Sequence, residues 1–161
     1  MRLTCRLVLA TCAAILASAC ASFRGASIRV PAEPGTAGET TAQVSQQEIS
    51  TVTEVVDGIA TQHQLERATL PERSFKEPDG QPHLVAMYQA RDPSGPNRRI
   101  FVSIDIAADR SEVVVGVADW GTVGGSKALD QISQEINDAI GRKLPDRRVS
   151  MSYKDLGAWG P

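Results

Sequence analysis

Residues 100–106, IFVSIDI, carry an isoleucine or a valine at every second position, which is the clearest period of two in the chain. Successive side chains of a β-strand point to opposite faces, so this period is typical of a strand with one buried face. We therefore predict a strand here and expect Ile104, near its centre, to be buried.

Further strands are predicted on both sides of this one. Residues 84–90 and 113–117 also alternate, and the segments that join them to residues 100–106 are short. Residues 92–97, DPSGPN, are rich in turn-forming types. Short connections join antiparallel neighbours, so the three strands should form a meander. A fourth strand is predicted at residues 149–153.

A helical period precedes the meander. Thr40 and Gln43 have the spacing of a capping box. Apolar positions then recur at intervals of three and four, at Ile49, Val52, Val56, Ile59 and His63. This period predicts a helix that ends near Arg67, before a polar, proline-rich loop at residues 71–82. The segment is also rich in valine, threonine and isoleucine, which favour strands.

A second helix is predicted between the meander and the last strand. Ser126 is a suitable N-cap, Arg142 and Lys143 lie near the end as the helix dipole prefers, and Pro145 stops the helix. The apolar positions are Leu129, Ile132, Ile136, Ile140 and Leu144. We expect Ile136 to be buried together with Ile104 and Val115.

These elements predict the order α-β-β-β-α-β within residues 43–161. One antiparallel sheet of about four strands, with both helices on one face, would bury all the apolar sets at once. The expected fold class is therefore α+β, in a single domain.

The N-terminus has the layout of a secretory signal peptide. Arg2 and Arg6 precede an apolar run at residues 7–16, and small residues at 17–19 lead to Cys20. The run is too short to span a bilayer, which takes about 20 apolar residues. Residues 1–19 are thus predicted to be a signal peptide. Cleavage before Cys20 would change the formal net charge from −2 to −4 by removing two arginines.

Residues 21–42 contain several prolines and glycines and no sustained apolar period. We predict that residues 20–42 form a flexible tether. Such a tether would hold the domain on the order of 25 Å from a membrane. The mildly negative net charge argues against nucleic acid as a partner and against binding of anionic lipid through a polybasic segment.

The segment that ends at Cys20 resembles the signal of a bacterial lipoprotein, although Leu16 lies one place early and Ala17 takes the usual leucine position. The resemblance implies diacylglycerol on the Cys20 thiol and an acylated amine. Ala21, in place of aspartate, implies sorting to the outer membrane, with the domain on its periplasmic face. The alternative is an ordinary signal peptide cut at the same bond, which would leave a secreted protein without lipid.

A weaker resemblance covers residues 113–140, where a strand, a glycine-rich bend and a helix are similar to those of small uncharacterised periplasmic lipoproteins. It assigns no activity. Lipid on Cys20 would also explain the one cysteine of the mature chain, since Cys5 and Cys12 lie within the signal.

Few residues suggest chemistry. The loop at residues 121–127, GTVGGSK, matches neither spacing of the glycine-rich phosphate-binding motifs, so we interpret it as a turn before a cap. The two histidines, His63 and His83, lack the spacing of a metal site. No cofactor is expected. Trp159 belongs to no apolar period. Its side chain could pack on the domain or on a partner, and the sequence favours neither.

Acidic residues gather around one hairpin: Asp105, Asp109, Glu112 and Asp119. A carboxylate pair there could perform acid–base chemistry, but such residues more often form the solvated face and turn of a sheet. We therefore expect no enzyme. The predicted function is binding or scaffolding in the cell envelope, with an unknown protein partner. The alternative is a small envelope enzyme in which Asp105, Asp119 and His83 converge.

Overall fold

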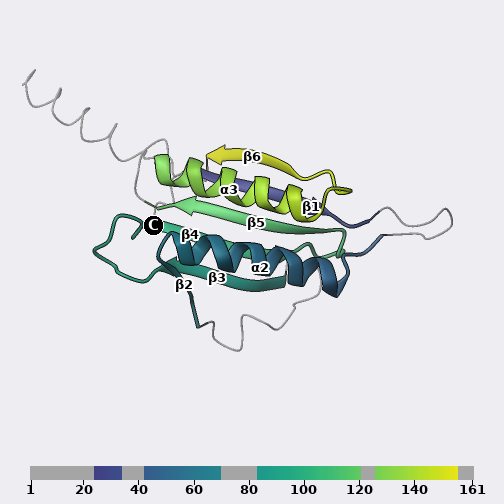
Figure 1. Ribbon diagram of the computed structural model, residues 1–161, viewed down its shortest axis with the longest axis horizontal. Helices are drawn as coiled ribbons and strands as arrows, with labels where there is room; N and C mark the ends of the chain where they lie inside the picture. Colours follow the sequence, from purple (N-terminus) through teal and green to yellow (C-terminus); the bar gives the residue numbers. More distant parts are fainter. Residues whose placement is uncertain (1–23, 34–41, 70–82, 121–125, 156–161) are drawn as a thin grey trace, which may run out of the picture.

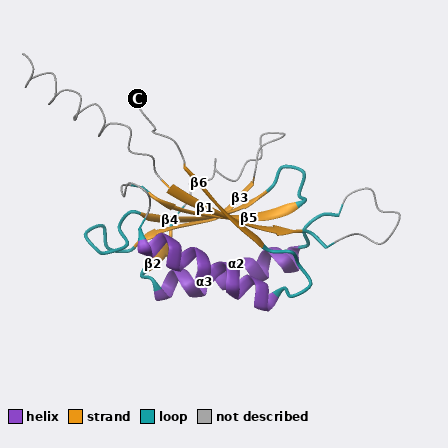
Figure 2. Cartoon of the chain, turned by 90° about the horizontal axis from the view of Figure 1, so that it is seen from above, coloured by secondary structure: helices purple, strands orange, loops and turns teal. Residues whose placement is uncertain are grey.

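The structure is a computed structural model that describes residues 24–33, 42–69, 83–120 and 126–155. The described chain forms one six-stranded sheet and two helices, which lie on the same face of the sheet (Figures 1 and 2). The strands are β1 (Arg24–Pro31), β2 (Leu65–Arg67), β3 (His83–Ala90), β4 (Ile100–Ile106), β5 (Glu112–Asp119) and β6 (Ser150–Asp155). The helices are α2 (Gln46–Gln62) and α3 (Lys127–Lys143).

The sheet has the strand order β2-β3-β4-β5-β1-β6, and every neighbouring pair is antiparallel. The α+β class, the single antiparallel sheet and the two helices are confirmed, as is the meander of β3, β4 and β5. The expectation of about four strands is wrong, because β1 and β2 were not predicted. The element order is β-α-β-β-β-β-α-β in the described residues.

The largest correction concerns β1, which lies inside the segment that we expected to be a flexible tether. It pairs with β5 on one side and with β6 on the other, so it is an interior strand. Ala26, Ile28 and Val30 alternate and are buried against the helices. Pro31 lies at the last position of the strand, where the loss of an N–H donor does least harm. Arg24–Pro31 therefore belongs to the sheet, although the predicted domain boundary at residue 43 left it out.

The first helix starts and ends elsewhere than predicted. Its capping box is formed by Ser45 and Glu48, whereas Thr40 lies outside the described residues. The helix stops at Gln62, and Gln64 adopts a left-handed φ of 59° that turns the chain into the short strand β2. The second helix agrees closely with the prediction, since Ser126 caps α3 and accepts a hydrogen bond from the Leu129 N–H.

The core lies between the sheet and the helices. Ile104, Val115 and Ile136 are 0%, 0% and 1% exposed, so their predicted joint burial is confirmed. His63 lies at the end of α2, where its ring makes a 2.7 Å contact with Glu135 of α3. It is thus a helix-edge residue. No described helix is long and apolar enough to cross a membrane.

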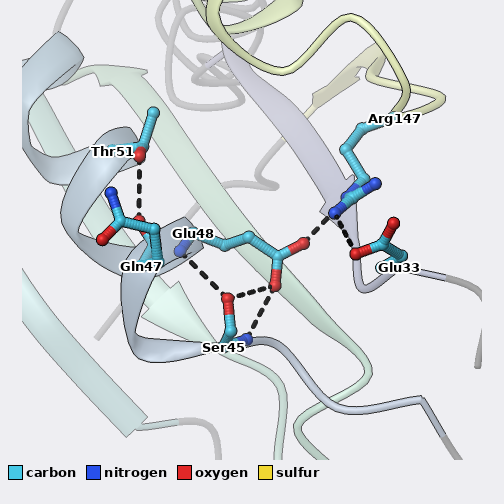
Figure 3. A network of polar contacts seen from close by, with 6 residues as sticks. All are labelled: Glu33, Ser45, Gln47, Glu48, Thr51 and Arg147. Atoms are coloured by element: carbon cyan, nitrogen blue, oxygen red, sulfur yellow. Dashed lines mark hydrogen bonds and ion pairs between the residues drawn. The ribbon is translucent and has the colours of Figure 1, made fainter.

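A polar network joins the start of α2 to the loop before β6 (Figure 3). The Ser45 N–H donates to Glu48 Oε2 at 2.7 Å, and Arg147 Nε donates to Glu48 Oε1 at 2.8 Å. Burial alone would raise the pKa of Glu48, but these hydrogen bonds outweigh it and hold the pKa below its usual range. Arg147 also contacts Glu33, just beyond β1, at 3.1 Å. The network therefore ties β1, α2 and the β6 loop together.

Candidate functional site

The two faces of the sheet differ in what covers them. In β4 the even-numbered residues are buried beneath the helices, while Phe101, Ser103 and Asp105 point to the opposite face. Both described helices lie on the first face, and no described helix lies over the second (Figure 2). We call the second face the open face.

Small residues meet in the middle of the open face. The register aligns Ser27 of β1 with Gly116 of β5, and Gly116 with Ser103 of β4. In the next row of the same face, Gly25 of β1 pairs with Ala118 of β5. Residues this small leave the backbone of three neighbouring strands with little side-chain cover.

Larger side chains surround these small residues. Met87 of β3 continues the row beyond Ser103, Phe101 lies beside Ala118, and Trp120 follows β5. Lys154 of β6 borders the opposite side, next to Gly25. Together these residues enclose a largely apolar hollow of about 620 Å³. This volume lies in the range of roughly 300–1,000 Å³ that is typical of ligand sites.

Aromatic rings form one wall of the hollow. The rings of Phe101 and Trp120 lie edge to face, with their centroids 6.5 Å apart and an interplanar angle of 86°. Trp120 is 40% exposed, although large apolar side chains are usually more buried. An exposed indole beside an apolar hollow is typical of a surface that contacts another apolar group.

Gly116 decides how deep the hollow is. A Cβ atom at this position would lie 2.9 Å from Ser103 Oγ, close enough to force the hydroxyl to move. Ser103 Oγ is itself held by a 2.9 Å hydrogen bond to Asp105 Oδ2. A larger side chain at position 116 would therefore project into the hollow and take up part of its volume.

The structure does not bring the predicted carboxylate pair together. Asp119 pairs with Ile100 at one end of the hairpin, whereas Asp105 pairs with Val114 five positions away. That spacing corresponds to about 17 Å along a strand. The two side chains also face opposite sides of the sheet. The structure therefore does not show the convergence of Asp105 and Asp119 that the alternative assumed.

Each hairpin acid has its own surroundings. Asp119 is 2% exposed on the helix side, so the expectation of a solvated residue is wrong there. It lines a small pocket together with Ser126 and Ala128, at the start of α3. Burial raises the pKa of Asp105, although the Ser103 hydroxyl and the neighbouring His83 partly lower it. Asp109 accepts hydrogen bonds from Ser111 in the turn.

The remaining candidates divide between described and undescribed residues. Glu112 of the hairpin contacts Arg29 at 2.6 Å. No group of three or more His, Cys, Asp or Glu side chains that could hold a metal occurs in the described ranges. The glycine loop at residues 121–125, the predicted signal, Cys20 and Trp159 lie outside those ranges.

Sequence reasoning missed the hollow. The usable signal was the run of small residues at outward positions of three strands, Gly25 and Ser27, Ser103, and Gly116 and Ala118. It was missed because β1 was not recognised, and because only the cross-strand register shows that these positions are neighbours.

Comparison with known proteins gave only distant structural likeness. No family model matches the chain, and no curated protein matches it. A hydantoinase/carbamoylase family amidase from Burkholderia ambifaria is similar with a TM-score of 0.36 and 16% identity, over 86% of this chain and 27% of the amidase. The corresponding amidase from Burkholderia multivorans gives 0.33 and 16%, over 84% and 27%. The chain thus spans about a quarter of their length, and likeness at these TM-scores carries no argument about function.

Proposed function

We propose that this chain is a lipid-anchored protein of the bacterial cell envelope that acts by binding an apolar ligand on the open face of its sheet. The observation that carries the proposal is the apolar hollow between Gly25, Gly116 and Trp120. It has the size and the lining of a ligand site, and it lies on the face of the sheet that neither described helix covers.

The anchor belongs to the proposal because of the signal that ends at Cys20. Since β1 begins at Arg24, Cys20 lies only four residues before the sheet. Four residues span at most about 14 Å, so a lipid on Cys20 would hold the domain against the membrane surface. This replaces the tether of about 25 Å that the sequence suggested. Gly25, which lines the hollow, would lie close to the anchor.

The anchoring part predicts a processed N-terminus. The mature protein should begin at Cys20 and should carry the added mass of acyl groups, because the thiol follows small residues at the cleavage site. Intact-mass spectrometry of the protein purified from membranes measures this directly. A Cys20→Ser variant is the matched control and should lack the acyl mass. An unmodified wild-type N-terminus would contradict the anchor and favour the secreted alternative.

The binding part predicts that filling the hollow removes binding. Gly116→Leu should weaken the binding of an anilinonaphthalene sulfonate probe at least about tenfold, equivalent to about 1.4 kcal/mol. The reason is that the leucine side chain would occupy the space beside Ser103. Fluorescence titration of the probe gives the two dissociation constants.

Gly58→Leu is the matched control for this titration. Gly58 is exposed on α2, on the other side of the sheet, and a Cβ there meets nothing within 4 Å. The control should bind the probe as the wild type does. Equal affinities for all three proteins would show that the probe binds elsewhere and would contradict the site.

A further inference from the structure

The hollow has a positive charge at one border. Of the described residues that line it, Lys154 of β6 alone carries a charged side chain. Lys154 is exposed and lies next to Gly25, on the side of the hollow opposite Phe101. A lysine ammonium is a compact charge with three N–H donors on a flexible stem. The β6 border is therefore where an anionic group of a ligand would find an opposite charge.

The other polar groups of the open face are engaged or repulsive toward an anion. Ser103 donates its single hydroxyl proton to Asp105 Oδ2 at 2.9 Å, so it has no proton to offer a ligand. Asp105 follows Ser103 on the same face of β4, and its carboxyl group, when ionised, would repel a second carboxylate. Arg29, farther along β1, is paired with Glu112 at 2.6 Å. These contacts favour an anionic group at Lys154 and an uncharged remainder over the small residues.

The distance across the hollow indicates the length of the ligand. One row of the open face crosses four neighbouring strands at Lys154, Gly25, Ala118 and Phe101. Three strand spacings of about 4.8 Å separate its ends by roughly 14 Å, a span that an extended acyl chain of medium length covers. The hollow of about 620 Å³ suits one such chain, whereas a phospholipid with two long chains exceeds the drug-sized ligands that such sites enclose.

We propose that the hollow binds a single-chain acyl anion of medium length, with its carboxylate at Lys154 and its chain directed across Gly25 and Gly116 toward Trp120. This inference rests on the proposed function, because it names the class of ligand for the same site. Apolar contacts with the lining supply most of the affinity. The exposed ion pair changes the affinity by up to about fivefold and sets the preference for a negative head group.

Reversing the charge at Lys154 tests the inference. The probes are decanoate, decanol and decylammonium, which share an apolar chain and differ in charge. Each is titrated calorimetrically below the concentration at which it forms micelles. The wild type should bind decanoate more tightly than decylammonium, and Lys154→Glu should reverse this order, changing the ratio of the two dissociation constants at least about tenfold. The affinity for decanol should stay the same.

Lys143→Glu is the matched control, because it makes the same change in net charge. Lys143 is exposed in the last turn of α3, on the face of the sheet away from the hollow (Figure 2). This variant should keep the wild-type order of affinities. A wild type that prefers decylammonium, an unchanged ratio in Lys154→Glu, or an equal change in both variants would overturn the inference.

Gly116→Leu separates this inference from the proposed function. If Gly116→Leu weakens the binding of all three compounds while Lys154→Glu leaves their order unchanged, the acyl-anion inference fails and the apolar site stands. If Gly116→Leu changes the affinity for none of them, the proposed site itself fails.

Discussion

Deleting Arg24–Pro31 should abolish the cooperative thermal transition of the domain. β1 lies between β5 and β6, so its removal leaves the facing edges of both strands without their hydrogen-bond partners. It also removes Ile28 and Val30, which are 0% and 1% exposed. The lost strand pairing and the lost burial of these side chains are together comparable with the roughly 5–15 kcal/mol that stabilises a typical domain.

Differential scanning calorimetry of the deletion variant checks this prediction. The control is Arg29→Ala in the same strand, which removes an ion pair with Glu112 that is partly exposed to solvent. Such pairs contribute about 0–1 kcal/mol, so the control should melt cooperatively near the wild-type temperature. If a chain that starts at residue 43 melted in the same way, β1 would not be an interior strand.

Truncating the core beneath the helices should cost about 2–5 kcal/mol per site. Ile104→Ala and Ile136→Ala each remove a fully buried side chain, one from the centre of β4 and one from α3. Both side chains lie in the same packed layer, so each substitution leaves a cavity that water does not reach. Chemical denaturation measured by circular dichroism gives the change in the free energy of unfolding.

Gln134→Ala is the matched control on α3. Gln134 is exposed, and its amide donates to Asp138 on the helix surface. Alanine is the best helix former, so this change should stay within about 0.5 kcal/mol. A cost below about 1 kcal/mol for Ile136→Ala would mean that α3 does not pack on the sheet as described.

Strong periods explain which parts of the fold the sequence predicts. The alternation around Ile104 and the helical spacing around Ile136 each extend over several residues, and both elements formed where expected. On the face of β1 that packs against the helices lie only Ala26, Ile28 and Val30, with Gly25 near the start of the strand and Pro31 at its end. Glycine and proline usually mark breaks, so a short alternation between them was outweighed.

Other misses came from competing local signals. Thr40 and Gln43 have the same capping spacing as Ser45 and Glu48, and only the packing of α2 distinguishes them. β2 has three residues, too few for a period, and it exists because Leu65 pairs with Ala90 of β3. Such pairing is nonlocal and leaves no trace in a single window of sequence.

The candidate site depends even more than β2 on contacts between residues that are far apart in the sequence. Ser27, Ser103 and Gly116 are neighbours only through the register of three strands. Whether their face is open depends on both helices packing on the other side (Figure 2). The carboxylates around the hairpin are close in sequence, yet the antiparallel geometry places Asp105 and Asp119 at opposite ends. Proximity along the chain was therefore a poor guide to proximity in the fold.

Amide chemical-shift mapping with the anilinonaphthalene sulfonate probe tests the proposed binding site most directly. As the probe is added to the isotope-labelled protein, the largest shifts should occur at Gly25, Ser103, Gly116 and Ala118, which line the hollow. Amides on the solvent side of α2 and α3 should not move. Shifts confined to the helices, or no shifts at saturating probe, would contradict the account of the open face as the binding site.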